Sequence, residues 1–160
     1  MKILGIDPGL VQTGFGVISV NGSNFSLVDY GIIKPDTKVD LSHRLLTIHQ
    51  DISSIIDDYF PNIIVIEDIF YGKNIKSALK LGQARGVAMV AAAARNLPIH
   101  EYSARKVKQA ITGNGNATKE QLQFMVKAIL NLDSLPSPID ASDALAIAIC
   151  HCQQFRENDL

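Results

Sequence analysis

The sequence lacks any long uncharged hydrophobic run, and this absence excludes a membrane-spanning protein. Near the N-terminus a short apolar stretch follows Lys2 and is interrupted by Asp7. Runs of this kind are far shorter than the roughly 18 residues that a transmembrane helix needs. The stretch also lacks the organisation of a secretory signal peptide. We therefore expect a soluble, cytoplasmic protein with no membrane partner.

Cysteine is scarce as well. The chain has two cysteines, Cys150 and Cys152, which flank His151. Adjacent side chains of a helix point about 100° apart, so these three residues are poorly placed to converge on one metal ion. Zinc-binding pairs are normally separated by two or more residues. We interpret the cysteines as two small core or surface thiols in a reducing compartment.

Acidic residues are nearly missing from one part of the chain, which we call the basic segment (residues 73–127). It has ten lysines and arginines but only Glu101 and Glu120 as acids, a charge of +8. The rest of the chain carries −9, so the overall charge of −1 hides a strong segregation. Ordinary exposed helices mix charges of both signs. The basic segment therefore predicts a surface that binds a polyanion.

Repeats, linkers and low-complexity tracts are also absent, and 47% of the 160 residues are hydrophobic. This composition predicts one domain, residues 1–160, with its own core. The periodicity of the apolar residues predicts strands at 2–7, 14–20, 25–33, 62–67 and 98–103, and helices at 40–59, 75–96, 103–111, from about 119, and from about 138. The fold class is therefore α/β, with a mixed five-stranded sheet of three antiparallel and two parallel strands and helices on both faces.

Two local features refine this prediction. Ser137 is the expected N-cap of the last helix, with Pro138 at its first position. In the helix expected at 75–96, Gly82 and Gly86 each cost about 1 kcal/mol relative to alanine. We therefore expect another element to pack closely on that face, either the sheet or a second subunit.

Carboxylates follow two of the predicted strands directly. Asp7 ends the apolar stretch "KILGI", and Glu67 ends "NIIVI". Ligand sites of α/β sheets lie at the carboxyl ends of the parallel strands. A right-handed crossover through the helix at 40–59 would make these strands neighbours. Asp7 and Glu67 are then expected to lie side by side.

The last predicted helix adds Asp140 and Asp143, which share one helical face. That face continues with Ala144 and Ile147, so the two acids are expected to face the sheet rather than water. For Asp140 alone, a simple interaction with the helix dipole is a competing interpretation. Four clustered carboxylates repel one another and suit Mg²⁺ or Mn²⁺. Two such ions can activate water for phosphodiester cleavage. The basic segment would bind the nucleic acid that is cleaved.

Four stretches carry a resemblance to a known family: "GIDPGLVQTGFGV", "IEDIFYGKNIKSALKLGQARGV", "EYSARKVKQAITGNG" and "DASDALAIAICH". In this order, over essentially the whole chain, the sequence resembles the RuvC family of Holliday junction resolvases, of the RNase H-like superfamily. The resemblance implies a homodimeric, metal-dependent endonuclease that nicks two opposed strands of a four-way DNA junction in recombination and repair. It also implies cooperation with a branch-migration motor of the RuvA and RuvB type.

The resemblance assigns roles to individual residues. Asp7, Glu67, Asp140 and Asp143 match the catalytic acids, which bind about two Mg²⁺ ions, with Mn²⁺ as a possible substitute. DNA contacts are implied or expected for Phe70, Lys73, Lys76, Arg105, Lys108 and Lys119. Phe70 would contact bases near the junction centre, while Lys108 and Lys119 would approach the DNA backbone near the scissile phosphate. Arg105 is expected to position that backbone.

Two other functions fit parts of the sequence. An actin-like or sugar-kinase ATPase also begins with "GIDxG" but needs two related domains and a second glycine-rich phosphate loop. A junction-binding module without activity could share the fold. Such a binder would gain nothing from four acids that repel phosphate, so the enzyme is the favoured interpretation.

Overall fold

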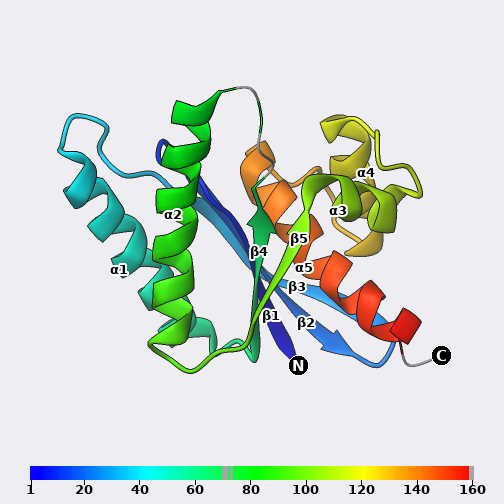
Figure 1. Ribbon diagram of the computed structural model, residues 1–160. Helices are drawn as coiled ribbons and strands as arrows, with labels where there is room; N and C mark the ends of the chain where they lie inside the picture. The colour runs from blue at the N-terminus through cyan, green and yellow to red at the C-terminus, as the bar shows by residue number, and fades with distance from the viewer. Residues whose placement is uncertain (70–71, 73, 159–160) are drawn as a thin grey trace.

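A computed structural model describes residues 1–69, 72 and 74–158 of the chain (Figure 1). Within them, five strands form one mixed sheet in the order β3-β2-β1-β4-β5. The strands are β1 (Lys2–Asp7), β2 (Thr13–Asn21), β3 (Asn24–Ile33), β4 (Ile63–Asp68) and β5 (Ile99–Ser103). β1, β2 and β3 form an antiparallel meander, whereas β4 pairs in parallel with β1 and with β5. The predicted fold class is confirmed.

Helices cover both faces of the sheet. They are α1 (Leu41–Tyr59), α2 (Ile75–Ala93), α3 (Ala104–Thr112), α4 (Lys119–Ile129) and α5 (Ile139–Asn158). Figure 1 shows α1 and α2 on one side of the sheet and α3, α4 and α5 on the other. Within the described residues, no helix combines the length and the hydropathy that crossing a membrane requires.

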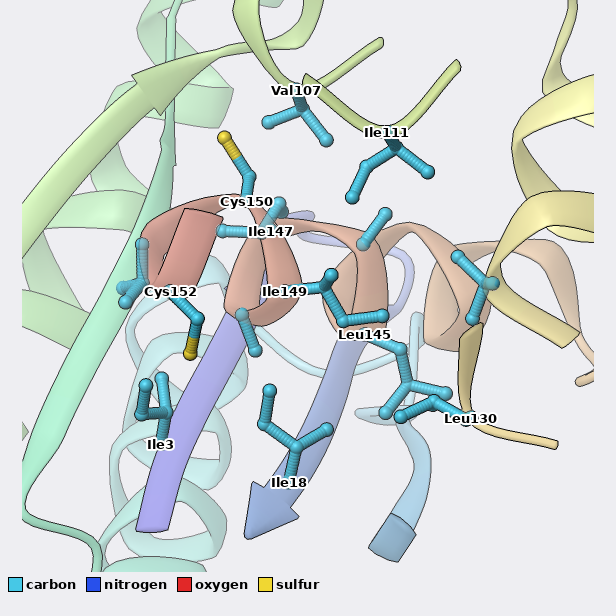
Figure 2. Packing of buried hydrophobic residues seen from close by; sticks show 14 of the residues in the cluster. Ile3, Ile18, Val107, Ile111, Leu130, Leu145, Ile147, Ile149, Cys150 and Cys152 are labelled. Carbon is cyan, nitrogen blue, oxygen red and sulfur yellow. The ribbon is translucent and has the colours of Figure 1, made fainter. Parts of the chain in front are cut away.

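The two faces of the sheet bury separate hydrophobic clusters. Leu4 and Ile6 of β1 face α1 and α2, whereas Ile3 faces α5. Figure 2 shows Ile3 and Ile18 of the sheet against Leu145 and Ile149 of α5. A strand that is covered on both faces has a continuous run of apolar residues, which explains why apolar and polar residues do not alternate in β1 and β4. Cys150 and Cys152 are buried, unbridged, in the same α5 cluster.

Glycines allow α5 to lie directly on the sheet. A Cβ atom built on Gly5 would lie 2.0 Å from the carbonyl oxygen of Ala144, and one on Gly14 would lie 2.0 Å from that of Asp140. On Gly16 it would lie 2.6 Å from the Leu145 side chain. A glycine within a strand often marks such a close backbone approach. The start of α5 is therefore held against the carboxyl end of β1.

Three details differ from the sequence predictions. α2 ends at Ala93 and not at residue 96, because the chain turns where the Leu97 amide donates to the Ala92 carbonyl. The α5 cap is one residue later than expected: the Pro138 carbonyl accepts the first helical hydrogen bond, from Ala141, and Ser137 lies outside the helix. Of the two packing partners expected for Gly86, the sheet is excluded, because a Cβ atom there would meet no described residue within 4 Å.

Candidate active site

Asp7 and Glu67 lie side by side at the carboxyl edge of the sheet, as the sequence predicts. β1 and β4 are parallel neighbours, with Ile6 paired to Ile66, so the next residues of the two strands are adjacent. The two carboxyl groups are close enough that each perturbs the pKa of the other. Two carboxyl groups in such contact share a proton readily, because both cannot ionise without repulsion.

α5 brings the second pair of acids to the same place. Asp140 and Asp143 lie in its first two turns, and one carboxylate oxygen each from Asp7, Asp140 and Asp143 lie within 4.8 Å of one another. The Asp143 side chain is only 12% exposed. Together with Glu67, the three aspartates line one cavity of about 720 Å³. The structure therefore brings the four acids to one cavity, with the three aspartates closest together, and their catalytic role stays a prediction.

The acids strongly perturb one another. Burial first, followed by repulsion from Glu67 and Asp143, raises the pKa of Asp7 from 3.8 to about 9. Burial also raises the pKa of Glu67 and that of Asp143. Desolvation and like charges both disfavour the ionised carboxylate, so the cluster retains protons in the absence of a cation. Hard oxygen ligands so arranged fit a divalent cation such as Mg²⁺ or Mn²⁺.

Two lysines of the basic segment line the same cavity, Lys108 on α3 and Lys119 at the start of α4. The Lys119 Nζ donates to Asp143 Oδ2 at 2.8 Å, and this hydrogen bond raises the pKa of Lys119. α4 begins with the predicted capping box, in which the amides of Gln121 and Thr118 bond each other's side chains. The box fixes the first turn of α4 and hence the position of Lys119.

Of the other four predicted DNA contacts, the structure describes Arg105 and Lys76. Arg105 on α3 and Lys76 on α2 are exposed, and neither lines the cavity. Phe70 and Lys73 lie outside the described residues. The DNA-contact roles of these four residues stay predictions.

The structure adds residues that the sequence analysis missed. Gln12, in the loop between β1 and β2, donates a side-chain hydrogen bond to Asp140 Oδ2. In addition, Gly5, Gly14 and Gly16 seat α5 on the sheet. Gly14 and Gly16 are two residues apart in one strand, a spacing that indicates from the sequence that another element packs closely on that face. No periodic signal connects Gln12 with a residue 128 positions away.

A cluster of carboxylates at the carboxyl edge of a mixed sheet, with lysines beside it, defines a nuclease of the RNase H-like class. The comparisons with known proteins make the assignment specific. The chain belongs to the RuvC family: the family model described as "Crossover junction endodeoxyribonuclease RuvC" matches residues 3–151. This family consists of endonucleases, which are hydrolases.

Individual relatives agree with this assignment. A crossover junction endodeoxyribonuclease RuvC of Protochlamydia amoebophila is 50% identical over 151 residues, which cover 94% of this chain and 90% of that protein. The RuvC structure from Thermus thermophilus is 33% identical, with a TM-score of 0.90 over 99% of this chain and 97% of that one. The structure of T. thermophilus RuvC in complex with a Holliday junction substrate is also 33% identical, with a TM-score of 0.93, and covers 99% and 96% of the two chains.

Proposed function

We propose that this protein is a metal-dependent endonuclease that resolves Holliday junctions by cutting two opposed strands symmetrically in recombination and repair. The observation that carries the proposal is the single cavity lined by Asp7, Glu67, Asp140 and Asp143 together with Lys108 and Lys119. The T. thermophilus relative, whose structure was determined with a Holliday junction substrate, supports the choice of substrate. Residues 1–160 are proposed to act as one domain.

Mg²⁺ is the proposed cofactor, with Mn²⁺ as a substitute and about two ions per site. Asp7, Asp140 and Asp143, whose oxygens lie closest together, would hold the metal with Glu67. Bound there, it would supply an activated water and stabilise the leaving oxygen of the phosphodiester. These residues are the proposed catalytic acids.

The lysines are proposed to hold the scissile strand. Lys108 and Lys119 lie at the same cavity as the acids, so a phosphate drawn to them would be placed next to the carboxylates. Lys119 is 53% exposed at its side chain even while bound to Asp143, so it is accessible to a DNA backbone. Arg105, Lys76 and Lys73 are proposed as further DNA contacts, and Phe70 is proposed to contact bases near the junction centre.

A homodimer is proposed because a junction offers two related strands and a two-fold protein presents one site to each. The outer face of α2 supports this. Ile75, Leu79 and Val90 are 74%, 64% and 59% exposed along one stripe. On the same stripe, a Cβ atom on Gly86 would meet no described residue within 4 Å, and among the described residues one on Gly82 would meet only the end of the Ile69 side chain, at 3.7 Å. Of the two packing partners expected for these glycines, a second subunit is the one we propose.

Further expectations follow from the family. We propose that the dimer works with a branch-migration motor of the RuvA and RuvB type, in the cytoplasm where the chromosome lies. Both proposals rest on the family to which the chain belongs and on the proposed substrate.

Incubation of a strand-labelled four-way junction with the protein tests the function. With Mg²⁺ we expect paired nicks at symmetric positions in two opposed strands, and with EDTA we expect none. A linear duplex of the same sequence is the control and should stay intact. If the junction is shifted in a gel but never cut, the protein is instead the non-catalytic junction binder.

Lys119→Ala should weaken junction binding with a recognisable dependence on salt. Each lost phosphate contact reduces the slope of log K against log [salt] by about 0.9. We expect a decrease of this size in titrations at several salt concentrations without metal. Lys80→Ala, an exposed lysine of α2 in the same basic segment, should leave the slope unchanged. An unchanged slope for Lys119→Ala would remove this lysine from the DNA interface.

Stabilisation of the protein by Mg²⁺ should increase with pH. The Asp7–Glu67 pair holds a proton in the folded state because the pKa of Asp7 is raised from 3.8 to about 9. In the metal-free protein this pair therefore makes the folded state less stable as the pH rises from 3.8 to about 9, because the unfolded chain releases the proton that the folded state retains. A divalent ion must displace the proton, so its affinity should rise as the pH approaches about 9. Melting curves with and without Mg²⁺, at a series of pH values, measure both trends. A pH-independent shift in the melting temperature would contradict the clustered site.

A further inference from the structure

We propose that Gln12 is a positioning residue that holds the Asp140 carboxylate in the orientation needed to bind the metal. The Gln12 side-chain amide donates to Asp140 Oδ2 and thereby links the loop after β1 to the first turn of α5. Gln12 also lines the cavity of the four acids. The inference rests on the proposed metal-dependent function.

The backbone around Gln12 is anchored on both sides. The hydroxyl of Thr13 donates to the Gly9 carbonyl at 2.8 Å and accepts from the Gly9 amide at 3.1 Å, and Thr13 is fully buried. A guanidinium N–H of Arg44 on α1 donates to the Leu10 carbonyl at 2.6 Å. These contacts close the loop on itself and tie it to α1. The amide of Gln12 is therefore presented to Asp140 from a fixed platform.

Asp140 needs such a partner more than its neighbours do. Asp143 is held by Lys119, and Asp7 lies beside Glu67 at the end of the neighbouring strand. Among the ion pairs of the part of the chain that the structure describes, none involves Asp140. A carboxylate has two oxygens, each with two acceptor sites, so the amide can bind one while the other remains for a cation. Because the amide is neutral, it orients Asp140 without adding a positive charge that would repel the metal.

Hydrogen-bond partners of metal ligands affect metal binding measurably. Their removal typically costs a factor of about 10–100 in metal affinity or activity. Gln12→Met keeps the length of the side chain but cannot donate a hydrogen bond. We therefore expect this variant to bind Mn²⁺ about ten-fold more weakly than the wild type, with an unchanged melting temperature in EDTA.

Calorimetric titration of the full chain with Mn²⁺, without DNA, tests the proposal. Gln50→Met, the same replacement at an exposed position of α1, is the matched control and should bind Mn²⁺ like the wild type. Equal or tighter Mn²⁺ binding by Gln12→Met would overturn the proposal. Weaker binding that comes with a lower melting temperature in EDTA would overturn it too, because Gln12 would then only stabilise the fold.

The same titrations separate this inference from the proposed function. If the wild type binds Mn²⁺ and Asp7→Asn does not, the metal site stands and only the role of Gln12 is being measured. If the wild type binds no better than Asp7→Asn, the metal site itself is wrong, and the role of Gln12 falls with it.

Discussion

Replacement of Asp7 by asparagine should abolish junction cleavage while junction binding stays close to that of the wild type. Asp7 lies at the centre of the acid cluster, between Glu67 of β4 and the aspartates of α5. The amide removes a metal ligand, so the loss should exceed the factor of about 100 that a partner of a ligand can cost. DNA binding should persist because the lysines of the cavity are unchanged. Cleavage and gel-shift assays on one labelled junction measure both effects.

Stability provides a second readout for the same variant. In EDTA at neutral pH the folded protein must keep Asp7 protonated, because the pKa of Asp7 is raised to about 9, whereas the unfolded chain ionises it. Asparagine is neutral in both states and removes the free-energy cost of that protonation, so Asp7→Asn should melt at the same temperature as the wild type or higher. Asp51→Asn, on the exposed side of α1, is the matched control and should cut junctions normally. Loss of binding with retained cleavage chemistry would show that Asp7 contacts DNA and is not a metal ligand.

Gly14→Ala should destabilise the protein and destroy the active site at the same time. The added Cβ would lie 2.0 Å from the carbonyl oxygen of Asp140 and 2.4 Å from its carbonyl carbon. Both are backbone atoms, so α5 as a whole would have to move away from β2. Overpacking typically costs about 1–3 kcal/mol, and a backbone clash belongs at the upper end. We expect a loss of about 3 kcal/mol in urea unfolding, together with loss of cleavage by the fraction that remains folded.

An alanine at a neutral strand position is the control for this prediction. Ser26→Ala lies at an exposed position of the edge strand β3 and should change stability by less than about 0.5 kcal/mol. If Gly14→Ala were as stable and as active as Ser26→Ala, the contact between β2 and α5 would be looser than the structure has it. The metal site would then not depend on that contact.

The sequence predicts the sheet and the acid cluster because both leave regular patterns. Asp7 and Glu67 each follow an uninterrupted apolar run, and parallel strands place their carboxyl ends together. Asp140 and Asp143 share a helical face that continues with the buried Ala144, which orients them toward the sheet. Each of these patterns depends only on the period of one element and on the topology that joins the elements.

Contacts between single side chains leave no such pattern. The bond from Gln12 to Asp140 joins an irregular loop to a helix and depends on the final packing. The start of α5 differs from the prediction for a related reason. Local geometry decides whether the carbonyl of Ser137 or that of Pro138 accepts the first helical hydrogen bond. Gly14 and Gly16 do carry a signal, since alternate glycines of a strand face the same neighbour. The partner of the Gly82 and Gly86 face depends on assembly, which the order of elements in one chain does not specify.

The glycine contact beneath α5 also bears on how this sequence can vary. Where Gly5 and Gly14 meet the carbonyls of Ala144 and Asp140, main chain lies against main chain, with no side chain in between. The spacing of the acids from sheet and helix is consequently independent of the volumes of the aliphatic residues deeper in the core. Substitutions among those residues can accumulate over evolution, or be introduced by a designer, while the carboxylates keep their separation.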